Sequence, residues 1–285
     1  MGTFIEVTSS DRRAPGIVFD EFKRIERLLS KYDSQSEIFR LNQQGRLQAS
    51  PETYDLIKRS KELSRVTAGA FDITVGPLMD IWGFADRDFQ IPSRAQIRRA
   101  LALVGSDKII LQDADNVVKL KIPGMKLDLG GIAKGFAIDR AVARLKSSGI
   151  TSCLINAGGQ VFCLGSKSGV PWRVAIQDPR NNDFRGYLEL VDRTIATSGD
   201  YNQYFIRDNR RYSHIIDPRS GYPADSGVVS VTVISDQGAL ADGLSTAIFV
   251  LGKDKARLLV NDFPGTEVKV IEEKDLVFKG KNIER

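Results

Sequence analysis

The stretch VVSVTVISDQGALADGLSTAIFVL, residues 228–251, contains both kinds of secondary structure expected in this fold. Its first part, VVSVTVIS at 228–235, is rich in β-branched residues and predicts a strand. The small and apolar residues from about Ala239 to Leu251 predict a helix that follows the strand directly. The fold should therefore pack helices against a sheet.

The rest of the chain mixes helices and hairpins instead of alternating strictly between strand and helix, which favours an α+β fold. Helices are expected at 16–31, from Pro51 to near Gly69, from Ser93 to Val104, and from after Gly131 to near Ser147. Strands are expected at 2–8, 108–112, 116–122, 126–129, 152–156, 160–165, 172–177, 187–192, 203–207, 267–272 and 275–279. No repeat or Pro/Ser-rich linker divides the chain, so residues 1–285 are expected to form one domain built on antiparallel sheet with packed helices.

The composition excludes several classes of protein. The chain of 285 residues is 42% hydrophobic and 27% charged, and its net charge of +5 is spread without a block of basic residues. This argues against a nucleic-acid binder. No apolar run reaches the roughly 18 residues that a membrane-spanning helix needs. The single histidine excludes a multi-histidine metal cage, and a Ser-His-Asp hydrolase would have to use that one residue.

The two cysteines, Cys153 and Cys163, have neither CxxC nor zinc-site spacing. They fall on strands expected to be neighbours, so a disulfide stays open. Two buried free thiols are the favoured interpretation.

The first candidate for chemistry is LDLGGIAKG at 127–135, where a strand is expected to end in two glycines before a helix begins. The first N–H groups of a helix and the positive end of its dipole attract phosphate. Lys134, in the first turn, adds a positive charge. The segment matches neither a Walker A loop nor GxGxxG. The alternative is tight packing of strand on helix, with a solvated lysine.

The second candidate is the pair Asp242 and Thr246, which lie four residues apart on the helix expected after Ala239. This spacing places both side chains on one face of the helix. A carboxylate and a hydroxyl suit Mg²⁺ when water and phosphate oxygens complete its octahedron. Spacing alone favours the alternative, in which Asp242 stabilises the helix start and Thr246 bonds back to a carbonyl.

The third candidate is YSHIIDPRSGYP at 212–223, where His214 ends a strand before a dense polar turn. Histidine is the usual proton acceptor near neutral pH, although a lone histidine is often structural.

A fourth stretch, TAGAFDITVGPLMDIWGF at 67–84, is rich in aromatic residues and broken by glycines. Phe71 and Trp82 could pack against an aromatic ligand, and Asp72 could accept its hydrogen bonds. Taken alone, core aromatics under a loop are the favoured interpretation. Two further segments are singled out: Ala157-Gly158-Gly159 is expected to form a close turn between strands, and Thr197-Ser198-Gly199 places backbone donors and hydroxyls together near a strand end.

Together these ordered motifs resemble the ApbE family of FAD:protein FMN transferases. The runs that carry the resemblance are MGT (1–3), KYDSQSEIFRLN (31–42), TAGAFDITVGPLMDIWGF (67–84), LDLGGIAKGFAID (127–139), INAGG (155–159), IATSGDYNQYF (195–205), YSHIIDPRSGYP (212–223), VSVTVISDQGALADGLSTA (229–247) and FVLG (249–252). The chain after about Pro264 carries little of the pattern.

The resemblance implies a T-fold-like ApbE architecture within the α+β class. Members of this family move FMN from FAD, their substrate, onto a threonine hydroxyl of a target flavoprotein and release AMP, leaving a phosphoester. Many targets are subunits of membrane redox complexes. The resemblance also implies Mg²⁺ as a cofactor.

The family's functional residues can be carried onto this sequence. The resemblance implies a FAD site lined by Met1, Tyr32, Ala70, Phe71, Asp72, Asp128, Lys134 and Ile216. It implies that Mg²⁺ is held by Asp242, Thr246 and the backbone carbonyl of Gly131, with a carbonyl from near Ser245 as an option. His214 would be the residue nearest the proton transfer, acting directly or through an aspartate.

Two features depart from the family or leave a question open. Gln160 follows INAGG where the family often has aspartate, so any role of a carboxylate there is in doubt. The chain opens at the MGT motif, although many members are exported lipoproteins. The expected location is periplasmic or membrane-anchored after loss of a leader, and otherwise cytoplasmic.

Three other functions are weighed against transfer. A Mg²⁺-dependent FAD pyrophosphatase would use the same site, with water in place of the threonine hydroxyl. Exclusion of water from the site would favour transfer over hydrolysis, and Tyr32 would contribute to that exclusion. A flavin-binding protein without turnover would have less need of Asp242 and Thr246. A nucleic-acid binder would have to use Arg207, Arg210 and Arg211, which instead suggest a solvated hairpin tip.

Overall fold

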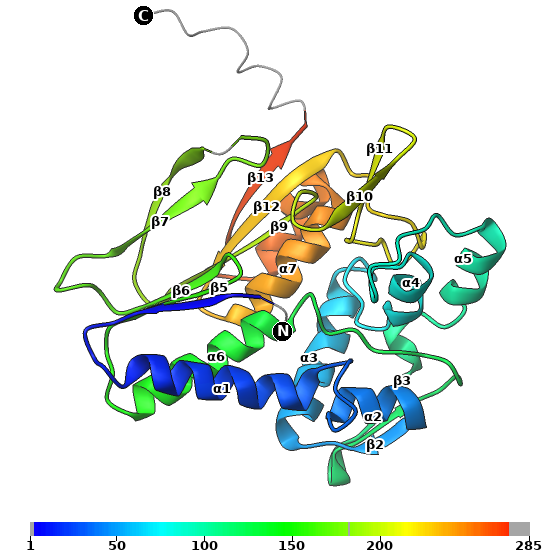
Figure 1. Cartoon of the computed structure of the whole chain (residues 1–285), viewed down its shortest axis with the longest axis horizontal. Coiled ribbons are helices and arrows are strands. Elements are labelled where there is room, and N and C mark those ends of the chain that lie inside the picture. Colours follow the sequence, from blue (N-terminus) through cyan, green and yellow to red (C-terminus); the bar gives the residue numbers. More distant parts are fainter. Residues whose placement is uncertain (1–2, 182, 274–285) are drawn as a thin grey trace, which may run out of the picture.

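A six-stranded antiparallel sheet forms the centre of the computed structural model, which describes residues 3–181 and 183–273 (Figure 1). The strands lie in the order β1 (Ile5–Thr8), β5 (Cys153–Ala157), β6 (Gln160–Leu164), β9 (Arg193–Gly199), β12 (Val228–Ser235) and β13 (Glu267–Glu272). Every residue of β12 is buried, so its valines form the middle of the core. The α+β class with antiparallel sheets is confirmed.

The two faces of this sheet are covered differently (Figure 1). On one face lie α1 (Ala14–Leu29), α6 (Ala133–Ser147) and α7 (Gly238–Leu251). On the other face lies the hairpin of β7 (Trp172–Gln177) and β8 (Phe184–Leu190), which packs on a small separate core. The alternation of side chains along each strand therefore supplies two apolar layers.

The same alternation keeps the two cysteines apart. Cys153 pairs across the sheet with Leu164, and Cys163 pairs with Leu154. Directly opposed residues share a face, so this register sends the two sulfurs to opposite faces, Cys153 into the large core and Cys163 into the small one. Both thiols are free and buried, as expected.

Smaller elements surround the sheet at one side. They are α2 (Glu37–Gln44), α3 (Pro51–Val66), a three-stranded sheet of β2 (Arg46–Gln48), β4 (Val117–Leu120) and β3 (Ile109–Gln112), then α4 (Gly76–Ile81), α5 (Arg94–Leu101), the hairpin of β10 (Tyr204–Arg207) and β11 (Arg210–Ser213), and α8 (Lys253–Leu259). Within the described residues, no helix is long and apolar enough to cross a membrane.

One expected strand is absent. Residues 126–129 form no ladder, because their backbone groups bond to loops and side chains instead. The Leu127 amide donates to Asn42 Oδ1 at 2.7 Å, and the Asp128 amide donates to the Ile73 carbonyl at 2.7 Å. The expected strand at 275–279 lies outside the described residues. Helices α2, α4 and α8 and strands β2 and β9 were not predicted.

Helices α6 and α7 cross at two glycines. A Cβ on Gly135 would lie 2.0 Å from the Gly238 carbonyl oxygen, and one on Gly238 would lie 2.4 Å from the Gly135 carbonyl oxygen. Asp139 of α6 accepts hydrogen bonds from the first two amides of α7, those of Gly238 at 2.5 Å and Ala239 at 2.9 Å. The crossing joins the start of α6 to the start of α7 through backbone contact.

We predict that Gly135→Ala lowers the free energy of unfolding by at least about 2 kcal/mol, because its methyl group would overlap backbone that cannot rotate away. Urea denaturation measures this. Gly16→Ala is the matched control, since Gly16 lies in α1 with nothing within 4 Å of an added Cβ. This control should be neutral or gain up to about 1 kcal/mol. Equal stability of the Gly135→Ala variant and the wild-type protein would contradict the close crossing.

Candidate active site

A pocket of about 700 Å³ opens beside the start of α6. This volume suits a small organic ligand, for which about 300–1,000 Å³ is usual. Eleven of the twelve residues proposed from the sequence line it: Tyr32, Ala70, Phe71, Asp72, Asp128, Gly131, Lys134, His214, Ile216, Asp242 and Thr246. The twelfth, Met1, lies outside the described residues. The fold thus brings together residues that are up to 214 positions apart, from Tyr32 to Thr246.

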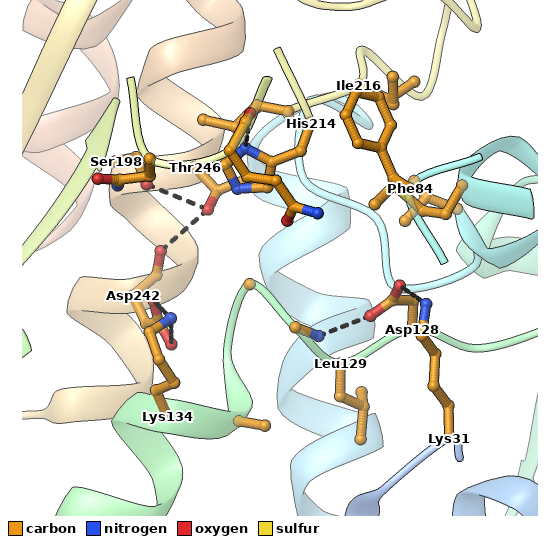
Figure 2. A pocket seen from close by; sticks show the side chains of 18 of the residues that line it. Lys31, Phe84, Asp128, Leu129, Lys134, Ser198, His214, Ile216, Asp242 and Thr246 are labelled. Carbon is orange, nitrogen blue, oxygen red and sulfur yellow. Dashed lines mark hydrogen bonds and ion pairs between the residues drawn. The ribbon is translucent and has the colours of Figure 1, made fainter. Parts of the chain in front are cut away.

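Lys134 and Asp242 form an ion pair on one side of the pocket (Figure 2). Lys134 Nζ lies 3.0 Å from Asp242 Oδ1, and the Gly135 amide donates to Asp242 Oδ2 at 3.1 Å. The carboxylate is buried, whereas the lysine is half-buried. The crossing of α6 and α7 therefore positions this pair, because Gly135 lies at the crossing and its amide binds the Asp242 carboxylate.

The start of α6 offers less to an anion than its sequence predicts. The Ala133 amide already donates to the Leu129 carbonyl at 2.8 Å, and the Gly135 amide is held by Asp242. The Lys134 ammonium, together with the positive end of the helix dipole, is thus the main attraction for phosphate on this side.

Oxygen atoms suited to a divalent cation gather next to this pair. Thr246 Oγ1 lies 3.3 Å from the Asp242 carbonyl and 3.4 Å from Ser198 Oγ. A Cβ on Gly131 would lie 3.3 Å from Thr246 Oγ1, so the backbone of Gly131 closely approaches that hydroxyl. Ser198, near the end of β9, also contacts Ser245 Oγ at 2.8 Å.

This donor set suits a Mg²⁺ ion that takes few ligands from the protein. Among the described residues there is no group of three His, Cys, Asp or Glu side chains that could hold a metal. Mg²⁺ commonly takes only one or two carboxylates and completes its shell with water and substrate phosphates. Asp242, Thr246 and the Gly131 carbonyl fit that pattern. A cation at Asp242 would share the carboxylate with Lys134.

His214 follows β11 and faces the pocket with one ring nitrogen fixed. Its Nδ1 lies 2.9 Å from the Gln203 carbonyl oxygen, which can only accept. Nδ1 therefore carries the proton in the neutral ring, and Nε2 keeps its lone pair. Burial lowers the pKa of His214 below 6.5, and the Lys134 charge lowers this pKa further. The neutral, proton-accepting ring is thus the form present at pH 7.

A second ion pair, which the sequence did not single out, lies across the pocket. Lys31 Nζ is 2.7 Å from Asp128 Oδ2, and Asp128 Oδ1 accepts from the Gly130 amide at 2.8 Å (Figure 2). Lys31 and Asp128 are 97 positions apart, so no local pattern reveals the pair. Beside it, Tyr32 is 67% exposed at the pocket rim and donates to the Ala85 carbonyl at 2.9 Å.

The aromatic stretch supplies one core residue and two pocket residues. Trp82 does not line the pocket, because its fully buried indole packs in the core, the interpretation favoured for this stretch taken alone, and donates to the Gly221 carbonyl at 2.9 Å. Phe71 lines the pocket as expected, and Phe84 also lines it and meets the His214 ring edge-on at 6.4 Å between centroids. Phe84 was not singled out from the sequence.

Asp72 lines the pocket, but its carboxylate is already occupied. It accepts from the Thr74 amide at 2.8 Å, the Thr74 hydroxyl at 2.6 Å, the Ser106 amide at 2.8 Å and the Ser64 hydroxyl at 3.2 Å. These bonds hold the loop that carries Ala70 and Phe71. Asp72 therefore shapes the pocket wall, and little of its accepting capacity is left for a ligand.

Gln160 has a structural task that aspartate could not perform. Its Nε2 donates to the Gly238 carbonyl at 3.0 Å, at the helix crossing, and the side chain is buried at the pocket wall. A carboxylate has no N–H to donate to that carbonyl. The amide thus supports α7 from the sheet side.

Most of the chain matches proteins of one known family. The profile of the ApbE family matches residues 1–270. The chain is 38% identical over 236 residues to the FAD:protein FMN transferase of Vibrio cholerae, which covers 80% of this chain and 70% of that protein. The crystal structure of the ApbE protein from Thermotoga maritima matches with a TM-score of 0.89 and 38% identity over 96% of this chain and 92% of that chain. The flavin transferase ApbE from Vibrio cholerae matches with a TM-score of 0.85 and 32% identity, with the same two coverages.

The single histidine allows a direct test of the His214 environment. In a protein purified without a histidine tag, one imidazole signal should titrate in an NMR pH series, with a midpoint below 6.5. Nitrogen shifts above the midpoint should report protonated Nδ1 and bare Nε2. A midpoint at or above 6.5, or the opposite tautomer, would contradict the geometry described here.

Proposed function

The chain belongs to the ApbE family, and on that basis we propose that it is a Mg²⁺-dependent enzyme that transfers FMN from FAD to a threonine hydroxyl of an acceptor flavoprotein and releases AMP. The enzyme class follows from the family, since the matched relatives are FAD:protein FMN transferases. The proposed mechanism rests on one observation: a neutral histidine, a lysine–aspartate pair and a cluster of oxygen atoms suited to a cation surround the same pocket.

The proposal places the diphosphate of FAD near Lys134, with flavin or adenine against the apolar wall. Phe71, Ala70 and Ile216 supply that wall. The Lys134 ammonium would offset phosphate charge electrostatically. Its pairing with Asp242 holds the ammonium in place before substrate arrives.

The reaction itself exchanges the phosphoanhydride bond of FAD for a phosphoester to threonine. The threonine oxygen attacks the phosphorus of the FMN half, and the bond from that phosphorus to the bridging oxygen breaks, so AMP leaves with that oxygen. The threonine proton passes to His214 Nε2, which the Gln203 carbonyl leaves free to accept it. When bound at Asp242, Thr246 and the Gly131 carbonyl, Mg²⁺ would supply further neutralisation of the diphosphate.

The acceptor and the compartment are parts of the same proposal. The resemblance to the family supports an acceptor that is a flavoprotein subunit of a membrane redox complex. It also supports a periplasmic or membrane-anchored location, with the cytoplasm as the alternative.

The test is to incubate the protein with FAD, Mg²⁺ and a candidate acceptor subunit, and to follow the acceptor by intact-mass spectrometry. We expect the acceptor to gain the mass of FMN less one water, and AMP to appear in equal amount. Replacing the acceptor threonine by alanine should abolish the adduct. FMN and AMP formed without any acceptor would support FAD hydrolysis instead, and an unmodified acceptor with intact FAD would contradict both reactions.

Two variants separate the roles within this assay. His214→Asn should slow transfer by about 10²–10⁴-fold, the usual contribution of a general base, while FAD binding measured by flavin fluorescence is kept. Asp242→Asn should abolish the stimulation by Mg²⁺. Transfer at the wild-type rate by either variant would remove that residue from the proposed mechanism.

A further inference from the structure

The Asp242 carboxylate is already bound by groups of the protein itself. Lys134 Nζ lies 3.0 Å from Oδ1 and 3.3 Å from Oδ2, and the Gly135 amide donates to Oδ2 at 3.1 Å. Figure 2 shows Asp242 between Lys134 and Thr246. The carboxylate is buried, so water screens its attraction to the ammonium only weakly. The charge of Asp242 is therefore largely offset by Lys134.

The Lys134 ammonium is an obstacle to a divalent cation at the same carboxylate. Asp242 is the only charged group among the proposed cation ligands, because Thr246 offers a hydroxyl and Gly131 a backbone carbonyl. A cation beside Asp242 would lie close to the positive charge of Lys134, and like charges repel strongly where screening is weak. Mg²⁺ also gives up its water reluctantly and seldom binds to protein ligands alone. The protein by itself thus offers a divalent cation only a weak site.

The other acidic residues that line the pocket do not remove this obstacle. Asp128 Oδ2 lies 2.7 Å from Lys31 Nζ, and Asp72 accepts four hydrogen bonds from its neighbours. Glu26, the fourth acid that the described residues place in the lining, also has a partner. A cation would therefore find little negative charge in the pocket that is not already engaged.

A diphosphate changes this balance, because it carries negative charge on both phosphates. Lys134 lies in the first turn of α6, where the helix dipole also favours an anion. Its ammonium is a point charge on a flexible stem, so it can turn from the carboxylate to a phosphate while the backbone of α6 stays in place. The Gly135 amide would still hold Asp242 Oδ2, and Oδ1 would be open to a cation. Phosphate oxygens and water would complete the shell of that cation.

We propose that Lys134 blocks the cation site of the FAD-free protein and leaves it when the diphosphate binds, so that FAD promotes the binding of Mg²⁺. This inference rests on the proposed transfer reaction and on its cation site at Asp242. Because the coupling between two ligands is reciprocal, Mg²⁺ should strengthen FAD binding by the same factor. Lys134 would thus pair with Asp242 before FAD binds and with a phosphate afterwards.

The test measures Mn²⁺ binding by electron paramagnetic resonance, because the signal of free aqueous Mn²⁺ falls when the ion binds to a protein. Mn²⁺ prefers the same carboxylate, carbonyl and water ligands as Mg²⁺. The full-length protein should bind Mn²⁺ at least about tenfold more tightly when it is saturated with FAD, which lies within the usual range of coupling between two sites. A titration of FAD alone corrects for Mn²⁺ that is held by the free dinucleotide.

Lys134→Met removes the ammonium and keeps a side chain of similar length. Without FAD, this variant should bind Mn²⁺ at least about tenfold more tightly than the wild-type protein, because the Asp242 carboxylate loses its competing cation. The additional tightening caused by FAD should be smaller than in the wild-type protein. Lys134→Arg keeps the positive charge and should bind Mn²⁺ as weakly as the wild-type protein. Removal of a lysine that only stabilised the fold would not raise the affinity for a cation.

The matched control is Lys126→Met. Lys126 likewise forms an ion pair with an aspartate, Asp80, with 2.5 Å between Nζ and Oδ2, but neither residue lines the pocket. The substitution changes the net charge of the protein by the same amount and also leaves a carboxylate without its lysine. Mn²⁺ binding by this variant should match that of the wild-type protein, both with and without FAD.

Three results would overturn the proposal: equal Mn²⁺ affinity of the wild-type protein with and without FAD, no tightening in the Lys134→Met variant, or equal tightening in the Lys126→Met control. The transfer reaction stands in each case if the acceptor still gains FMN. If neither the wild-type protein nor the Lys134→Met variant binds Mn²⁺ even with FAD, the proposed cation site fails, and this inference fails with it. An acceptor that gains no FMN refutes the transfer reaction, whatever the Mn²⁺ titrations show.

Discussion

The contact between the backbones of α6 and α7 at Gly135 and Gly238 is the constraint on which the site depends. Only glycine permits this approach, because a Cβ at either position would overlap a carbonyl oxygen. The contact brings the Gly135 amide to Asp242 and places Lys134 on the same carboxylate. Gln160 and Asp139 hold the same junction from the sheet and from α6. The charges of the pocket are therefore positioned by backbone packing and not by flexible side chains alone.

In the proposed reaction, the acid–base and electrostatic roles fall on different parts of the fold. Lys134 and Asp242 lie on the helices, whereas His214 is carried by the strand end next to Gln203. Burial lowers the pKa of the imidazole, which in the proposed reaction accepts a proton, whereas Lys134 would bind phosphate. A second pair, Lys31 and Asp128, closes the opposite side. The wall between them is apolar enough to receive an aromatic ring system.

Sequence patterns predicted the helices and strands that are determined by neighbouring residues in the chain. The valine-rich β12 and the strands β7 and β13 match the expected bounds at both ends, and Ser50 accepts from the Thr53 amide to begin α3 as expected. The prediction of a strand at 126–129 was wrong, because the backbone amides of this segment donate to Asn42 and Ile73, which are distant in sequence. Lys31 was missed for the same reason, since its partner Asp128 lies 97 positions away. Most of the residues that we singled out, and that line the pocket, came from family motifs and not from periodicity.

The most direct test of the account is a crystal structure of the protein with FAD and Mg²⁺ bound. The account predicts the diphosphate beside Lys134, with electron density for the cation between a phosphate oxygen and the Asp242 carboxylate. It also predicts that the Gly135–Gly238 contact is unchanged. A diphosphate bound away from Lys134, Gly131 and Thr246 would contradict the central claim that the helix junction forms the site of phosphoryl transfer.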